Sequence, residues 1–193
     1  MQPWLIAVIV IGSLLVVGII SYIIWYWVMF NKLVELSERV KNGWSQIEVY
    51  LKKRYDLVPN LVETVKGYAK HESETLSNVT MWRSKATSAT TQADVMKANS
   101  ELSNAIGRLL VSVENYPDLK ANANFMKLQD ELKNLEDKIS FARQFYNDVA
   151  QKNNETIRKF PNSVIANKHK DKFPRADYFE VEEVAYEAPK VSF

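Results

Sequence analysis

An uncharged stretch at residues 4–30 constrains this chain more than any other feature. It reads WLIAVIVIGSLLVVGIISYIIWYWVMF, and as a helix it would be about 40 Å long, which exceeds the roughly 30 Å hydrocarbon core of a bilayer. Trp4 lies at its start, and Trp25, Tyr26 and Trp27 lie near its end, as aromatic side chains do at the two membrane interfaces. The sequence therefore predicts a transmembrane helix whose residues 4–30 contact the lipid bilayer.

A cleaved signal peptide is the alternative to an anchor. Signal peptides have a basic start, an apolar run of about 7 to 15 residues and a cleavage site of small residues. Here only Met1, Gln2 and Pro3 precede the run, and bulky aromatic residues occupy the place of cleavage. We therefore expect the stretch to remain as an anchor.

The positions of the cations predict the orientation of this anchor. No Lys or Arg precedes the span, whereas Lys32, Arg39, Lys41 and the run 52–54 follow it. Loops on the cytoplasmic side of a membrane carry the excess of Lys and Arg. We expect a single-pass protein with its N-terminus outside and its C-terminal domain in the cytoplasm.

The charge balance and the absence of cysteine exclude several classes of function. The chain has 25 Lys and Arg against 23 Asp and Glu, so no excess charge would attract nucleic acid. It has no Cys, which excludes disulfides, thiolate metal sites and cysteine nucleophiles. Its five glycines are isolated and form no phosphate-binding or dinucleotide-binding loop.

Beyond the span, apolar residues recur at intervals of three and four, which predicts amphipathic helices. The first such series runs from Leu33 to Tyr55 and resumes from Val58 to Ala69. Pro59 lacks a backbone donor and disfavours helix in the residue before it. We expect the helix to continue from the membrane span and to be kinked or briefly broken between Arg54 and Pro59.

Two further series complete the helical pattern. One runs from Val95 to Val113 and ends at a turn, Tyr116-Pro117-Asp118, and the other runs from Phe125 to Phe160 with Asn153 as a polar member. Residues 84–94 lie between the first series and the one that begins at Val95. They are either a loop or a weakly amphipathic helical turn.

These patterns predict an all-α fold, in which an N-terminal transmembrane helix is followed by a long antiparallel up-and-down bundle of three to four helices. A parallel coiled coil is the alternative, and the turns favour a folded-back bundle. Gly43, Gly67 and Gly107 fall inside predicted helices, where close approach of another helix is a reason to have glycine.

We expect three parts: a transmembrane anchor at 1–31, a cytoplasmic helical bundle at 32–166 and a C-terminal tail at 167–193 strapped to the bundle. Phe173-Pro174 disfavours helix at the start of that tail. Its docking residues would be the following apolar side chains: Tyr178, Phe179, Val191 and Phe193. A partner-binding tail and a disordered tail are the alternatives.

Several separated motifs occur along the whole chain. They are residues 53–68, KRYDLVPNLVETVKGY, with His71-Glu72; residues 114–122, ENYPDLKAN; residues 128–132, LQDEL; Ala142-Arg143 with residues 145–148, FYND; residues 160–162, FPN; and residues 189–193, PKVSF. Together they resemble the LemA family of bacterial membrane proteins. The chain departs from that family's pattern at Asn153, at Val149-Ala150 and in the basic insertion 168–172.

The resemblance implies a single N-terminal span in the bacterial inner membrane, a cytoplasmic helical bundle and no established biochemical activity. Members of the family tend to be encoded near membrane peptidases and envelope proteins. We therefore expect a non-enzymatic membrane-anchored helical scaffold or adaptor of the bacterial envelope. The alternative is an accessory subunit of a membrane peptidase or another enzyme, whose site a partner completes.

No catalytic, cofactor-binding or metal-binding residues are predicted. His71-Glu72 begins like a helical zinc-protease motif, but Thr75 stands where the second His ligand would be. A catalytic triad would have to use His71 on an amphipathic helix, and His169 is expected in a solvated turn. Arg54 and Asp56 are interpreted as an ion pair that braces the kink at Pro59.

The remaining expectations concern packing and partners. Trp44 and Trp82 are predicted to be core or anchor residues and not a ligand cage. The basic residues at 52–54 would lie about 33 Å beyond the span, too far to attract lipid, which leaves Lys32 as the cation at the headgroups. Tethered bundles are held at high local concentration, which favours a homo-oligomer. The resemblance implies an envelope protein or a membrane peptidase as a further candidate partner, and the charge balance indicates no nucleic acid.

Overall fold

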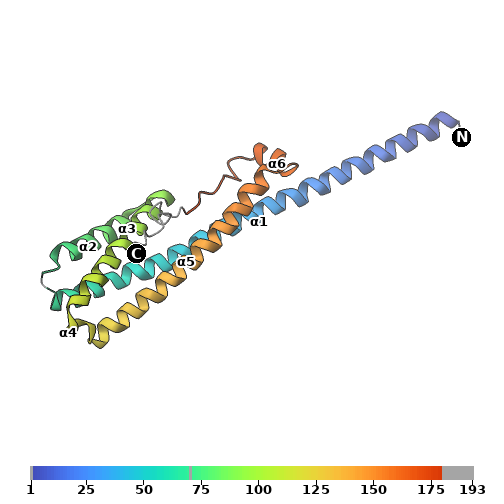
Figure 1. Ribbon diagram of the computed structural model, residues 1–193. Helices are drawn as coiled ribbons and strands as arrows, with labels where there is room; N and C mark the ends of the chain where they lie inside the picture. The colour runs from blue at the N-terminus through green and yellow to red at the C-terminus, as the bar shows by residue number, and fades with distance from the viewer. Residues whose placement is uncertain (1, 70, 180–193) are drawn as a thin grey trace, which may run out of the picture. The chain divides into compact units, whose positions relative to one another are not determined.

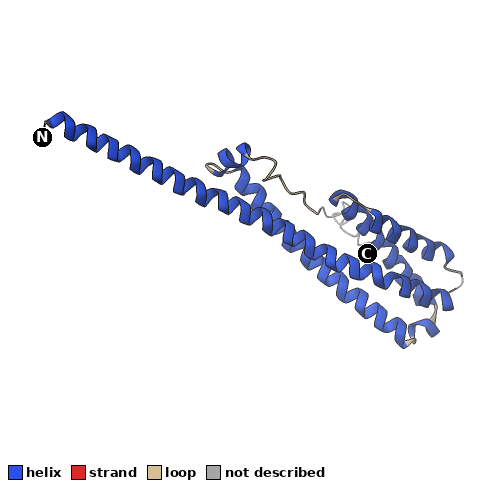
Figure 2. Cartoon of the chain, turned by 180° about the vertical axis from the view of Figure 1, so that it is seen from behind, coloured by secondary structure: helices blue, strands red, loops and turns tan. Residues whose placement is uncertain are grey.

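The computed structural model describes residues 2–69 and 71–179, and all regular secondary structure in them is helical (Figures 1 and 2). The prediction of an all-α chain is confirmed. The elements are α1 (Pro3–Tyr68), α2 (Ser73–Ser88), α3 (Gln92–Ser112), the short 3₁₀ helix η1 (Val113–Asn115), α4 (Pro117–Lys120), α5 (Ala123–Arg158) and α6 (Asn162–Lys168).

Helix α1 contains the whole apolar stretch and is long and apolar enough to cross a membrane. It runs for 66 residues, so the first helix does continue directly from the predicted span. Large apolar side chains in its first part, among them Leu14, Ile20 and Trp27, are exposed. Such an uncovered apolar surface is what a lipid-facing helix requires.

The expected break between Arg54 and Pro59 is wrong, because α1 passes through both residues without interruption. The alternative, a kink in the continuous helix, stays a prediction. A proline inside a helix leaves the carbonyl oxygen four residues earlier without its usual donor. That oxygen belongs to Tyr55, and Arg83 Nε from α2 donates a hydrogen bond to it at 2.8 Å. The donor that Pro59 lacks is thus supplied by a neighbouring helix.

The chain divides into two compact units. Unit 1 comprises the residues up to Asn42 together with Asp148–Ala176, and unit 2 comprises Gly43–Asn147 together with the residues after Ala176. The division of the sequence into anchor, bundle and tail at 31 and 166 stays a prediction.

The core of unit 2 is formed by one face each of α1, α2, α3 and α5. Its buried side chains include Leu61 from α1, Val79 from α2, Leu102 from α3 and Leu132 from α5. Helices α2 and α3 lie side by side (Figure 1). The polar residues 84–94 are therefore mostly helical, with a loop only at 89–91.

Side-chain caps fix the starts of α3 and α5. Thr91 Oγ1 accepts a hydrogen bond from the Asp94 backbone N–H at 3.1 Å, which satisfies one free donor of the first turn of α3. Asn122 Oδ1 accepts from the backbone N–H groups of Asn124 and Phe125 in the same way at α5. The predicted turn at Tyr116-Pro117 is confirmed, since Pro117 is the first residue of α4.

Close helix approach does not explain two of the interior glycines. A Cβ placed on Gly67 or on Gly107 would meet no atom within 4 Å. That expectation is therefore wrong for both residues.

Residues 174–179 follow α6 as an extended segment, and asparagines of α5 hold its backbone. In unit 1, Asn154 Oδ1 accepts from the Ala176 N–H at 2.9 Å and its Nδ2 donates to the Ala176 carbonyl at 2.8 Å. In unit 2, Asn147 makes the same pair of bonds to Phe179, at 2.9 and 3.1 Å. Of the predicted docking residues, Phe179 packs on Trp44 and Tyr146, whereas Tyr178 is exposed and the expectation is wrong for it. Val191 and Phe193 lie outside the described residues.

Candidate functional site: a buried arginine in unit 2

Arg54 of α1 is the largest side chain that is almost completely buried, with only 1% of its surface exposed. Its position follows from helical spacing, since it lies three residues after Leu51 and four before Val58, and both of these are core residues. Burying a guanidinium is costly unless acceptors compensate its charge, and here Nη1 and Nη2 are paired while Nε has no partner among the described residues. The structure therefore has to surround Arg54 with acceptors.

Those acceptors come from α3 and α5. Arg54 Nη1 donates to Ser103 Oγ and to Glu136 Oε2, both at 2.7 Å. Its Nη2 donates to Asn99 Oδ1 at 2.7 Å and to the Asn99 carbonyl at 3.3 Å. The arginine thus joins three helices of unit 2 through one charged group.

A second layer of polar contacts surrounds this group. Asn99 Nδ2 donates to Tyr55 Oη at 2.6 Å and to the Val95 carbonyl at 2.8 Å. Burial raises the pKa of Tyr55 above its usual value, although the hydrogen bond from Asn99 and the charge of Arg54 act in the opposite direction. Tyr55 therefore stays a neutral phenol.

The pairing of Arg54 with Asp56 is wrong. Asp56 is exposed, and the carboxylate that pairs with Arg54 belongs to Glu136. Sequence reasoning missed the partners because they lie 45 and 82 residues away. The signal that was present is the spacing of Arg54 between two core residues.

A groove of about 380 Å³ lies beside this arginine and is lined from α1, α3 and α5. Ile106, Leu110 and Leu132 give it apolar walls, and Glu136 and Lys133 are its charged members besides Arg54. Glu136 is already ion-paired, so it is not a free general base. The groove thus combines apolar walls with charged groups of which two, Arg54 and Glu136, are paired with each other.

The two histidines belong to different units of the chain. His71 lies in the turn between α1 and α2 and is exposed, so its expected place on an amphipathic helix is wrong. Its neighbour Glu72 accepts a hydrogen bond from Tyr116 Oη at 3.2 Å, which connects the turns that follow α1 and η1. In residues 2–69 and 71–179, no three His, Asp or Glu side chains are placed to hold a metal ion.

His169 lies in unit 1 and is not the solvated turn residue that was expected. Its ring is half-buried, and its Nε2 lies 3.0 Å from Tyr26 Oη in a hydrogen bond. That the chain has no catalytic, cofactor-binding or metal-binding residues stays a prediction.

The core position predicted for Trp44 is confirmed, and Trp82 packs against the core without being fully buried. Trp44 is buried, with its ring centroid 5.7 Å from that of Tyr146 and 5.6 Å from that of Phe179. Trp82 is half-buried against the core of unit 2, and Lys85 Nζ lies 4.1 Å from its ring centroid. Both side chains serve packing.

Curated proteins of similar sequence cover most of the chain. It is 28% identical to Protein LemA of Metamycoplasma hominis, over 80% of this chain and 70% of that protein. It is 26% identical to Magnetosome protein MamQ 2 of Paramagnetospirillum magneticum, over 86% of this chain and 70% of the relative. Magnetosome protein MamQ of Magnetospirillum gryphiswaldense is 24% identical, over 85% and 69% respectively.

The family model described as LemA family matches residues 43–193. This range contains the buried arginine, its partners on α3 and α5, the Glu72–Tyr116 contact and both asparagines that hold the extended segment. The chain belongs to the LemA family.

Proposed function

We propose that this protein is a non-enzymatic, membrane-anchored helical scaffold or adaptor of the bacterial envelope. The observation that carries the proposal is the single helix α1, which contains the apolar span and then supplies core residues to the bundle of unit 2. A continuous helix ties a binding surface to the membrane without a flexible linker. Such a construction suits recruitment more than catalysis.

The ion pair of the buried Arg54 in unit 2 supports the same proposal. Arg54 and Glu136 neutralise each other and join helices, as charged groups in structural networks do. An enzyme of this size would need a nucleophile, a base or a metal centre facing an open cavity. Neither Protein LemA nor the MamQ proteins carry the name of an enzyme.

The orientation belongs to the proposal as well. With the N-terminus outside the inner membrane, the bundle lies in the cytoplasm, where the cations after the span favour it. Protease added to spheroplasts tests this arrangement. The bundle should remain intact until the membrane is permeabilised, and its digestion from outside would contradict the proposal.

Photocrosslinking in native membranes tests the scaffold role. A photoreactive residue replaces Val111 or Phe141 in the full-length chain, because both side chains are exposed on unit 2. We expect defined adducts with envelope proteins or with further copies of the chain. The matched control carries the photoreactive residue at Leu102, which is buried in the core and should give no partner adduct.

The result also separates scaffold from accessory subunit. Adducts with a membrane peptidase whose purified activity depends on this chain would favour the accessory subunit. If Val111 and Phe141 give no more adducts than Leu102, the scaffold proposal fails.

A further inference from the structure

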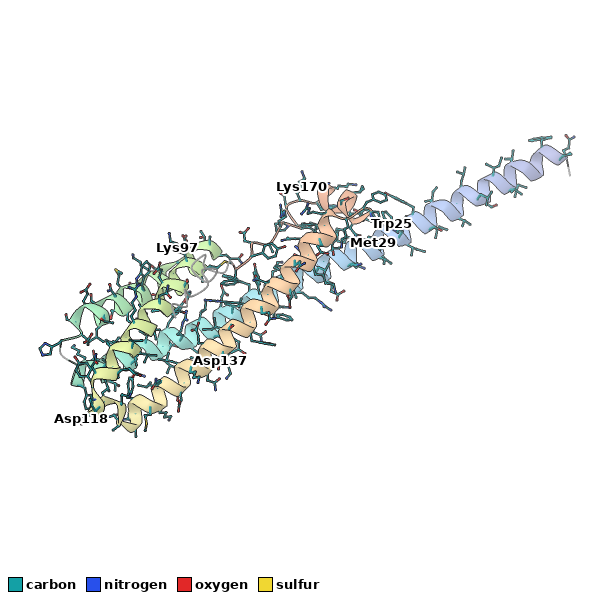
Figure 3. All side chains as sticks on the ribbon, in the orientation of Figure 1. Trp25, Met29, Lys97, Asp118, Asp137 and Lys170 are labelled. Atoms are coloured by element: carbon teal, nitrogen blue, oxygen red, sulfur yellow. The ribbon has the colours of Figure 1, made fainter. Side chains whose placement is uncertain are left out.

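The turn that follows α6 is fixed against the end of the apolar span. In unit 1, His169 is hydrogen-bonded to Tyr26 at 3.0 Å, and its ring centroid lies 5.5 Å from that of Phe30. Phe173 packs on the same ring at 5.4 Å. Figure 3 shows Lys170 on this turn, beside the part of α1 where Trp25 and Met29 lie. Residues far apart in sequence therefore meet beside the predicted membrane interface.

The depth of this turn follows from the position of Tyr26 and Phe30. Both belong to the aromatic end of the span, and one helical turn separates them by about 6 Å along the axis. Trp27, which lies between them, is 70% exposed and free to face lipid. Tyr and Trp at helix ends lie at the level of the lipid headgroups. If α1 spans the bilayer, His169 lies at the same level.

The turn is strongly basic. Lys168, Lys170 and Lys172 are exposed, and Asp171 is the acid among them. The ion pairs found among the described residues involve none of these three lysines. Lys172 Nζ instead lies 5.9 Å from the Phe30 ring centroid. Lys32 is therefore not the only cation near the end of the span.

Packing orders the turn that carries these cations. Leu33, Ile157, Ile165 and Phe173 form the buried core of unit 1, and Tyr26 and Phe30 pack against it. Because this core and the Tyr26–His169 bond order the turn, a ligand of the lysines meets a site that is already arranged. A basic turn that is held at headgroup level attracts anions of the membrane surface.

We propose that the basic turn, residues 168–172, binds the phosphate headgroups of anionic phospholipids. Each lysine supplies an ammonium group as a point charge and hydrogen-bond donor to a phosphate oxygen. The proposal rests on insertion of α1 into the bilayer, but it does not depend on the scaffold role. It adds a lipid preference to what would otherwise be a purely hydrophobic anchor.

The test uses the full-length protein in nanodiscs made of equal parts phosphatidylglycerol and phosphatidylcholine. Native mass spectrometry after release counts the lipids of each kind that stay bound. The basic-turn variant carries three substitutions: Lys168→Gln, Lys170→Gln and Lys172→Gln. The control variant loses the same charge at exposed positions of α5: Lys127→Gln, Lys133→Gln and Lys138→Gln.

We expect the wild type and the control variant to retain phosphatidylglycerol in preference to phosphatidylcholine. The basic-turn variant should lose this preference by about fivefold for each lysine removed at low salt. A third variant with arginine at positions 168, 170 and 172 keeps the charge and should keep the preference. Raising the ionic strength should weaken it, because surface charges are screened.

Three results would overturn the proposal: no preference in the wild type, an equal loss in the control variant, or loss of the preference when inorganic phosphate is added at constant ionic strength. The last would indicate a site for free anions. A chain that inserts into nanodiscs without lipid preference refutes the lipid site alone. A chain that fails to insert refutes the membrane anchor as well.

Discussion

Arg83 should stabilise unit 2 only as long as Pro59 occupies α1, and a double-mutant cycle measures this dependence. Pro59 has no N–H to offer to the Tyr55 carbonyl, and Arg83 Nε bonds that oxygen at 2.8 Å. In the Pro59→Ala background, the new N–H of residue 59 can take this acceptor in the ordinary helical pattern. The contribution of Arg83 should then disappear.

The expected size follows from the half-buried setting of the bond. A hydrogen bond from a charged donor contributes about 1.5 to 3 kcal/mol. Because Arg83 is half-buried, we expect Arg83→Met to lower the free energy of unfolding by about 1.5 kcal/mol, the lower end of that range. In the Pro59→Ala background the same change should cost less than about 0.5 kcal/mol, which gives a coupling energy of about 1 kcal/mol.

The wild type, the two single variants and the double variant are compared by thermal unfolding of the full-length protein in mild detergent. Circular dichroism of the helices monitors the transition. A loss of 1.5 kcal/mol corresponds to a fall in Tm of about 3 to 6 °C for a chain of this size. Arg108→Met is the matched control, since Arg108 is exposed on α3, and its small effect should be equal in both backgrounds. Equal costs of Arg83→Met with and without Pro59 would refute the reasoning.

Three further changes test the packing of unit 2 by the same melting assay. Gly107→Ala should stabilise the protein by about 0.5 to 1 kcal/mol, because the added methyl group meets no atom and the helix gains propensity. No shift or a fall in Tm would contradict this. Tyr146→Phe should stabilise it by about 1 kcal/mol at neutral pH, because the buried Tyr146 hydroxyl has no hydrogen-bond partner among the described residues. Burial, and then the charge of Asp177, raises the pKa of Tyr146 above 10.0. The folded state therefore keeps its full stability below pH 10 and loses stability as the pH rises through the raised pKa, because the unfolded state ionises first. An alkaline titration should therefore destabilise the wild type more than the variant, and equal curves would contradict that cause. Arg54→Met should destabilise the protein by about 3 kcal/mol, the low end for a broken buried pair, because Glu136 is half-exposed and regains water. A loss below about 1 kcal/mol would mean that the network contributes little.

Apolar spacing predicted the helices α1, α3 and α5, because it records which face of a helix is buried, but it indicated no series for α2 (Ser73–Ser88). The series that begins at Leu33 contains five residues that are all buried: Leu33, Leu36, Trp44, Ile47 and Leu51. The same reasoning extended the last helical series to Phe160, and this boundary is wrong. That side chain lies beyond α5 and is 83% exposed.

The polar interactions could not be predicted, because they depend on which helices become neighbours. Arg54 fits the spacing of the stripe, but only the fold shows that Asn99 and Glu136 face it. Tyr26 and His169 are 143 residues apart and are joined by the return of α5 and α6 along α1 within unit 1. A contact between residues so far apart cannot be predicted from the sequence around either of them.

Pro59 fails as a helix breaker for a similar reason. The local rule considers only the missing N–H of the proline. The compensating donor is Arg83, 28 residues after Tyr55 in sequence, and it becomes available only once α2 has folded back on α1. A local penalty was thus offset by a tertiary contact.

The asparagine side chains of α5 hydrogen-bond the backbone of the extended segment 174–179, so its path depends little on its own side chains. Asn154 and Asn147 each bond the N–H and the carbonyl of one backbone residue, Ala176 and Phe179 respectively. Any residue except proline offers those two groups, so composition at Ala176 is free to vary while the course of the chain is kept. The two asparagines of α5 therefore determine where this segment binds, and the side chains of the segment can change without loss of these backbone hydrogen bonds.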